Sequence, residues 1–156
     1  MIPLSKQIKL IAGVLYTRQR MYNERPVLDP EEFKRMLEEA EPSLKGFFDQ
    51  LVAGTNLQTK SYMINDKNKK RLVSICYFLA GLNNKFINGV KAEIGFLLDV
   101  SGASSSAIET IAGAGLTVRR MTIARQKAQY AEVHTMIVDK FISENVRTSM
   151  DIINIL

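Results

Sequence analysis

The sequence predicts an all-α fold, and three observations carry that prediction. Apolar residues recur at helical spacing along most of the chain. Signals for helix starts and ends punctuate the chain, and no segment alternates apolar and polar residues long enough for a strand. Hydrophobic residues make 46% and charged residues 24% of the 156 residues, which is ordinary for a globular protein. We expect a single-domain bundle of about six helices over residues 1–156.

The N-terminal helices of this bundle are expected within residues 1–57, and their looser attachment to a main core over 58–156 is left open. Ser5 can cap a first helix that runs to about Tyr22. Asp29 followed by Pro30 is a strong helix start, because the carboxylate caps while proline suits the first helical position. A further short helix is expected over 44–54, before an irregular stretch over 55–64. The apolar stripe of the first helix is Ile8, Ile11, Val14, Leu15 and Met21.

The central helix is expected to begin after Asp66 as its cap and to end at Asn83-Asn84. From Leu72 to Leu82 it is apolar nearly all round, which is typical of a helix buried on all sides. The expected core residues are Ile75, Cys76, Leu79, Ile94 and Leu97.

Three further helices follow in the C-terminal half. The first covers about 86–98, and a short one follows that Ser104 or Ser105 caps and Gly113-Ala114-Gly115 closes. Thr117 is expected to cap a long last helix reaching about Asn145 or beyond. Its narrow apolar seam is Met121, Ala124, Ala128, Ala131 and Val138, widened by Ile137, Phe141 and Ile142.

Charge is distributed in blocks along the chain, whose net charge is +5. Residues 1–25 carry +4, residues 26–57 carry −4, residues 58–91 carry +6 and residues 92–156 carry −1. This pattern indicates two basic surfaces separated by an acidic one, or simply solvated faces.

The residues that commonly carry chemistry form no complete site. Cys76 lies in an apolar run and is expected to be a buried hydrophobe, and a single cysteine excludes an internal disulfide. Cys76 and the only histidine, His134, cannot form a zinc cage without carboxylates, and His134 is expected to be a packing or surface residue. Gly113-Ala114-Gly115 lacks the third glycine of a dinucleotide fingerprint and follows a helix, so it is read as a turn. The sequence therefore predicts no catalytic residue, no metal, no cofactor and no enzyme activity.

No stretch approaches the roughly 20 apolar residues of a membrane span. Residues 1–16 are interpreted as an amphipathic helix, not as a signal peptide. We therefore expect no membrane partner and an intracellular location, in the nucleus or the cytoplasm.

The strongest positive signal is a helix-turn-helix-like order over 87–125: a helix, a turn, a short helix, a glycine turn, and a long helix with a basic start. Residues there that suit phosphates and base edges are Arg119, Arg120, Thr122, Arg125 and Gln126. A second basic group consists of Lys67, Lys69, Lys70 and Arg71. The loop from Gly113 to Thr117 is longer than the usual tight turn. A corner in an ordinary bundle and a solvated helix start are the alternatives for the two groups.

Several short stretches also resemble a known group of proteins: 78–86 (FLAGLNNKF), 95–98 (GFLL), 101–104 (SGAS) with Ala107-Ile108, and 115–118 (GLTV). Over about 72–125 the chain resembles a helical region of uncharacterised, multi-copy, transposon-associated proteins of fungi. In those proteins this region lies upstream of a larger domain of unknown function. The resemblance implies no catalytic residue. The apolar residues 152–156 would suit a truncated copy or an interaction tail.

Two classes of function remain open. One is a nucleic-acid-binding module of a transposon-type protein, with DNA favoured, acting through the two basic groups. The other is a structural or oligomerisation module whose long last helix pairs with a partner helix. A single face shared by both basic groups would favour binding, and basic groups that point apart would favour a scaffold.

Overall fold

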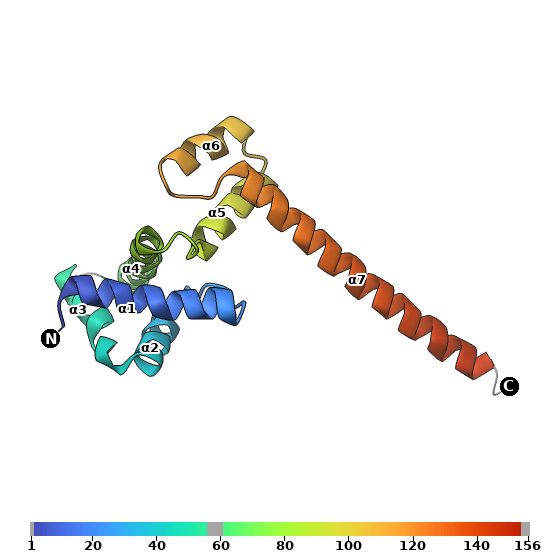
Figure 1. The fold of residues 1–156 in the computed structure, drawn as a ribbon, viewed down its shortest axis with the longest axis horizontal. Coiled ribbons are helices and arrows are strands. Elements are labelled where there is room, and N and C mark those ends of the chain that lie inside the picture. The colour runs from blue at the N-terminus through green and yellow to red at the C-terminus, as the bar shows by residue number, and fades with distance from the viewer. Residues whose placement is uncertain (1, 56–60, 154–156) are drawn as a thin grey trace. The chain divides into compact units, whose positions relative to one another are not determined.

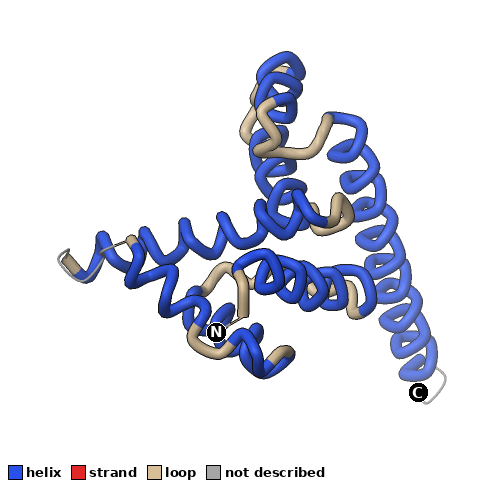
Figure 2. The backbone as a smooth tube through the Cα atoms, turned by 60° about the vertical axis from the view of Figure 1, so that its left-hand side comes forward, coloured by secondary structure: helices blue, strands red, loops and turns tan. Residues whose placement is uncertain are grey.

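The computed structural model describes residues 2–55 and 61–153, and within them every regular element is a helix, as predicted (Figure 1). Figure 2 shows the described connections between these helices as loops and turns. A π-helical turn, Thr17–Met21, extends α1, and a short 3-10 helix, Pro42–Leu44, precedes α3. The seven α-helices are α1 Leu4–Tyr16, α2 Pro30–Ala40, α3 Phe47–Gly54, α4 Tyr62–Asn83, α5 Gly89–Val100, α6 Ser105–Gly113 and α7 Arg120–Ile153.

The chain divides into two compact units, residues 1–93 (unit 1) and 94–156 (unit 2). The looser attachment left open for the helices before residue 58 is not seen within unit 1, because α1 and α2 pack directly against α4. The boundary between the two units falls inside α5. Of the irregular stretch expected over 55–64, residues 56–60 lie outside the described residues, and residues 62–64 are helical. Residues 154–156 also lie outside them.

The core of unit 1 forms where α2 and α3 meet α4. The Phe33 ring lies 5.9 Å from the Phe48 ring and 5.5 Å from the Tyr77 ring, between ring centroids. The Tyr77 hydroxyl accepts a hydrogen bond from the Val27 amide at 2.9 Å, so its polar end is satisfied. The least exposed side chains of this core include Leu15, Phe33, Leu37, Leu44, Val73 and Cys76.

Two of the expected helix starts are confirmed at atomic detail. The Asp29 carboxylate accepts a hydrogen bond from the Glu32 amide at 2.9 Å, and Pro30 is the first helical residue. The Ser104 hydroxyl accepts one from the Ala107 amide at 3.1 Å. Both signals are local, because the capping group and the amide are three residues apart.

The other three expected caps are wrong. α1 begins after Pro3, which leaves Ser5 inside the first turn. α4 begins at Tyr62, so Asp66 lies within the helix and pairs with Lys70. Thr117 lies three residues before α7 and is only 4% exposed, because its hydroxyl packs beside Gly95.

The expectation of a central helix buried on all sides is also wrong. Cys76 is buried, and Ile94 is half-buried. Ile75, Leu79 and Leu97 are 47%, 36% and 64% exposed, respectively. α4 packs through one side only, which carries Leu72, Val73, Cys76, Tyr77 and Ala80.

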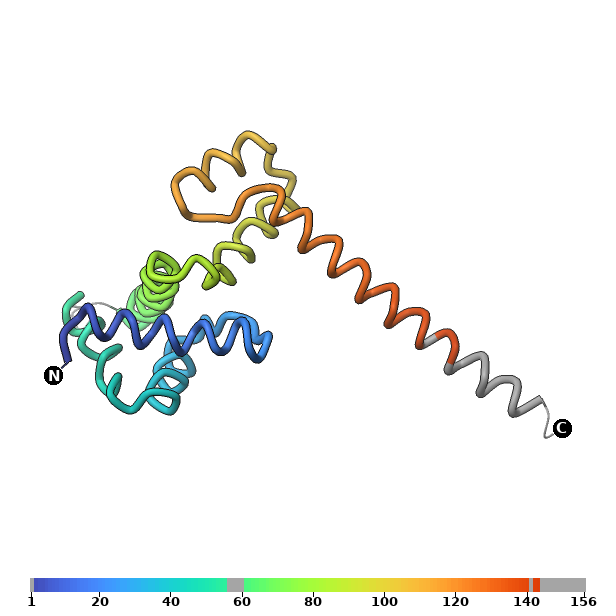
Figure 3. Tube along the Cα trace, in the orientation of Figure 1, coloured from blue at the N-terminus to red at the C-terminus, as the bar shows by residue number. Residues whose placement is uncertain are grey.

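Unit 2 contains the end of α5, α6 and α7, and Figure 3 shows the chain passing from α6 through a loop into α7. The Phe96 and Tyr130 rings meet edge to face with centroids 5.6 Å apart. Asp99 and Lys127 form an ion pair between α5 and α7. Beyond these contacts every side chain from Lys127 to Lys140 is exposed. The side chain of Phe141, expected in the apolar seam, lies outside the described side chains.

Candidate nucleic-acid interface

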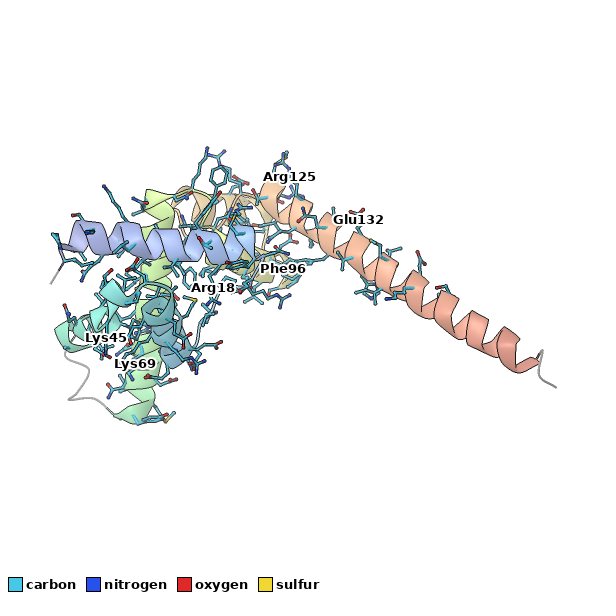
Figure 4. The ribbon with its side chains drawn as sticks, turned by 60° about the horizontal axis from the view of Figure 1, so that its bottom comes forward. Arg18, Lys45, Lys69, Phe96, Arg125 and Glu132 are labelled. Atoms are coloured by element: carbon cyan, nitrogen blue, oxygen red, sulfur yellow. The ribbon has the colours of Figure 1, made fainter. Side chains whose placement is uncertain are left out.

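Three arginines stand at the start of α7, as the sequence predicted for the basic end of the helix-turn-helix-like segment. Arg119 immediately precedes the helix, and Arg120 and Arg125 lie in its first two turns. All three side chains are exposed, and within the part of the chain that the structure describes none forms an ion pair. Figure 4 shows Arg125 near the start of α7, with Glu132 farther along the same helix.

The position of this helix start is fixed from α6. A carboxylate oxygen of Glu109 accepts a hydrogen bond from the Arg120 amide at 3.0 Å, which satisfies one of the amides left open at the start of α7. Gly115 adopts a left-handed φ of 78° in the turn after α6, and Ile123 is 1% exposed. Six residues, 114–119, separate the two helices. That connection is longer than the roughly 3–4 residues of a helix-turn-helix.

The expected contact residues of α7 do not share one side of the helix. Thr122, Arg125 and Gln126 lie within roughly 100° of one another around the axis, whereas Arg120 is roughly 140° from Arg125. Thr122 and Gln126 are half-buried, and the side-chain oxygen of Gln126 is buried without a hydrogen-bond partner among the described residues. This arrangement suits backbone phosphate contacts better than the reading of base edges.

The second expected group lies in the middle of α4, not at its start. Lys69 pairs with Glu31 of α2 at 2.9 Å, and Lys70 pairs with Asp66 at 2.7 Å. The hydrogen bond that the Lys70 ammonium donates to the Asp66 carboxylate raises the pKa of Lys70. Arg71 donates to the Asn68 side chain at 3.0 Å, and Lys67 is exposed. Two of the four charges are therefore already balanced by carboxylates.

These two basic groups belong to different units, the lysines and Arg71 to unit 1 and the arginines near the start of α7 to unit 2. The arginines of unit 2 carry the stronger case, because residues 110–131 hold four cationic side chains and no acidic one.

A third basic cluster, in unit 1, was not predicted. Arg20 donates to the Phe86 carbonyl at 3.1 Å, and its guanidinium lies 5.5 Å from the centre of the Phe86 ring. The Lys85 ammonium lies 5.3 Å from the same ring, which is 50% exposed. The sequence shows that Lys85 and Phe86 are neighbours, but it does not predict the contact with Arg20, which lies 66 residues away from Phe86.

The residues that could carry catalysis or hold a metal are dispersed. Burial raises the pKa of the Cys76 thiol to about 12, so this thiol is protonated at neutral pH. His134 is exposed on α7. Among the described residues no three or more His, Cys, Asp or Glu side chains gather where they could hold a metal ion. No described helix is both long and apolar enough to cross a membrane.

Comparison with known proteins adds no relative. No family model matches the chain, and neither a curated protein nor a solved structure is measurably similar to it.

Proposed function

We propose that this chain is a non-enzymatic helical module that contacts the phosphate backbone of DNA through Arg119, Arg120 and Arg125. The observation that carries the proposal is their exposure without ion-pair partners among the described residues. Its setting in a transposon-type protein, inside the cell in nucleus or cytoplasm, is supported only by the resemblance over residues 72–125.

The character of the binding follows from the arrangement of the arginines. Cations that replace counterions along DNA give an affinity that falls steeply with salt, without reading sequence. Because Thr122 and Gln126 are half-buried, few groups remain for base edges. Binding should therefore be weak and largely independent of sequence, with a dissociation constant on the order of 10⁻⁴ to 10⁻⁶ M at physiological salt.

The test is a titration of mixed-sequence duplex DNA at several salt concentrations. Each phosphate contact contributes about 0.9 to the slope of log affinity against log salt, so the triple variant Arg119→Ala, Arg120→Ala, Arg125→Ala should lower the slope by up to about 2.7. The matched control is the triple variant Lys67→Ala, Lys69→Ala, Lys70→Ala, which lowers the net charge of the chain by the same three units. An absence of wild-type binding, or an equal loss of slope in both variants, contradicts the assignment to the arginines.

The melting temperature of the same triple variant separates this proposal from the bundle alternative. That alternative required the arginines to pair with acids such as Asp99 or Glu109. Instead, Asp99 pairs with Lys127, and Glu109 accepts from the Arg120 backbone amide. The alanine variant should therefore melt within about 2 °C of the wild type, since exposed, unpaired residues contribute little to stability. A large drop in melting temperature would indicate that these side chains stabilise the fold, as the bundle alternative requires.

A second candidate function is assembly through α7, which a separate observation favours. Over 14 consecutive residues, Lys127 to Lys140, no described side chain is buried. Helices in proteins are stabilised mainly by the packing of an apolar side, more than by the helix propensity of their residues. Beyond Tyr130, whose ring meets Phe96, α7 carries such a side uncovered in its own unit: Val133, Met136 and Ile137, each 54–66% exposed.

Sedimentation equilibrium tests this second function directly. The wild type should associate reversibly, and Ile137→Glu should weaken association, because it places a charge in the apolar row. Thr135→Glu, on the opposite side of α7, is the matched control. A wild-type chain that stays monomeric at all concentrations measured would exclude assembly.

A further inference from the structure

The outer side of α4 carries an apolar row that its own unit leaves uncovered. Ile75, Leu79 and Leu82 are spaced four and three residues apart, so they lie on one side of the helix. They are 47%, 36% and 81% exposed, while the opposite side of α4 is packed. Large apolar side chains in such a continuous row typically mark a contact with another surface.

Positive charge borders this row. Residues 67–92 contain six cationic side chains and no acidic one, and two of the six, Lys69 and Lys70, already pair with Glu31 and Asp66. Arg71 is two helical turns before Phe78, and the two share one edge of the row. The Lys91 ammonium lies 5.8 Å from the centre of the Phe78 ring, so it sits beside that position. The row thus has cations about two turns apart along one edge.

The exposed part of α7 has the complementary pattern. Val133, Met136 and Ile137 form its apolar row, and each is more than half exposed. Glu132 and Asp139 are seven residues, or about two turns, apart and follow one edge of that row. Residues 127–142 hold these two acids with two bases, Lys127 and Lys140, and Lys127 already pairs with Asp99.

We propose that the apolar row of α7 in one copy of this chain packs on the apolar row of α4 in a second copy, reciprocally. This inference rests on the second candidate function and names the surface that α7 meets. Lys67 to Leu82 and residues 127–142 each span 16 residues, about 24 Å of helix, so the two rows match in length. The carboxylates of Glu132 and Asp139 face the edge that carries Arg71 and Lys91.

Pairing of α7 with α7 would satisfy this pattern less well. It would leave the α4 row exposed in both copies, and the cations it would offer to the acidic edges are only Lys140 and Lys127, which already pairs with Asp99. Oppositely charged edges add little to the net affinity of a contact. They determine which surfaces pair and in which orientation, because any pairing that brings like charges together costs free energy. The contact of α4 with α7 covers both apolar rows and matches both edges.

The experiment uses two single variants of the full chain, alone and mixed. Leu82→Glu disables the α4 row, and Ile137→Glu disables the α7 row. Tyr62→Glu and Thr135→Glu are the matched controls, since each is exposed on the opposite side of the same helix. Association is measured by sedimentation equilibrium, and mixed pairs are detected by energy transfer between differently labelled chains.

We expect both row variants to lose association at least tenfold, while both controls associate as the wild type does. On mixing, the α4 of the Ile137→Glu chain and the α7 of the Leu82→Glu chain remain intact. The mixture should therefore form a pair that neither variant forms alone, held by one contact instead of two.

Three results would overturn the inference, and each has a distinct meaning. A monomeric wild type removes the assembly function together with the inference. Loss of association in Ile137→Glu with full association of Leu82→Glu leaves assembly through α7 standing, but places its partner elsewhere than on α4. Loss in both variants without recovery on mixing excludes a contact between these two rows.

Discussion

At the scale of single residues, the Asp29 cap gives the most direct test of local structure. Its carboxylate accepts the Glu32 amide hydrogen bond at 2.9 Å, one of the open amides at the start of α2. Asp29→Ala should lower the free energy of unfolding by about 1 kcal/mol, whereas Asp29→Asn should keep most of it. Urea denaturation measures both. An alanine variant as stable as the wild type would show that water replaces the cap without cost.

Two apolar residues that look alike in sequence differ in their environment. Phe33 is fully buried between two rings, whereas Leu79, expected in the core, is 36% exposed. Phe33→Ala should cost about 3–5 kcal/mol. Leu79→Ala should cost about 1 kcal/mol, because its truncation leaves no enclosed cavity. Denaturation at a concentration low enough to avoid association compares them, and equal costs would contradict the exposed side of α4.

The buried thiol and phenol of α4 predict a loss of stability at alkaline pH. Burial raises the pKa of Cys76 from 9.0 to about 12 and that of Tyr77 from 10.0 to about 12. Above pH 9 the unfolded chain loses protons that the folded chain retains, so stability falls as pH rises from about 9 to 12. Each group contributes a slope approaching roughly 1.4 kcal/mol per pH unit.

Denaturation at pH 8 and pH 10.5 checks this, with Cys76→Ala as the control that removes the thiol's share of the slope. The two pH values bracket the ordinary pKa of both groups. A wild-type stability that stays constant over this range would mean that both groups ionise in the folded state as they do in water.

At the scale of elements, the sequence predicted what depends on neighbouring residues. The start of α2 at Asp29 and of α6 at Ser104 and the end of α4 at Asn83 all follow from signals within a few residues. Thr117 carries the same kind of local signal, yet its hydroxyl is used in packing beside Gly95, 22 positions earlier. When a contact with a residue far away in the sequence decides the role of a side chain, the neighbouring residues alone do not predict that role.

The close approach of α5 to the start of α7 gives a prediction for Gly95. A Cβ added there would lie 2.5 Å from the Thr117 hydroxyl oxygen and 2.9 Å from a terminal carbon of Ile123, so neighbouring atoms must shift. Gly95→Ala should therefore destabilise unit 2 by about 1–3 kcal/mol despite the better helix propensity of alanine. Thermal and urea denaturation measure the loss.

Gly113→Ala is the matched control in the same unit. It lies in the last turn of α6, and an added Cβ there meets nothing within 4 Å. This variant should be neutral or up to about 1 kcal/mol more stable. If both alanines behave alike, the tight contact at Gly95 does not exist in solution.

At the scale of the whole molecule, the apolar pattern predicts helices but not which of their sides meet. From Leu72 to Leu82 α4 is apolar nearly all round, and nothing in that sequence distinguishes the side of Val73, which is buried, from that of Leu82, which is exposed. The candidate site shows the same limit. In the sequence Lys69 looks like an unpaired cation. In the structure it pairs with Glu31, which lies 38 positions away in the chain. The lack of an ion-pair partner for the arginines at the start of α7, among the described residues, agrees with the sequence, because residues 110–131 contain no acid.

The exposed length of α7 predicts how backbone protection varies through the molecule. Hydrogen exchange reports local opening, which is easiest where few apolar contacts hold a helix. At low concentration the amides of 131–143 should exchange faster than those of 72–80, whose helix packs on α1 and α2. Raising the protein concentration should slow exchange selectively in α7, because association supplies the packing that its own unit lacks.

Ile137→Glu separates this coupling from a simple effect of concentration. Its α7 amides should remain fast at every concentration, whereas those of Thr135→Glu should slow as in the wild type. The amides of α4 are informative as well, since they should gain protection in parallel with α7 if α4 is the surface that α7 covers. Protection of α7 that is already complete at the lowest concentration would mean that the helix is stable without a partner, and the physical basis for assembly would be lost.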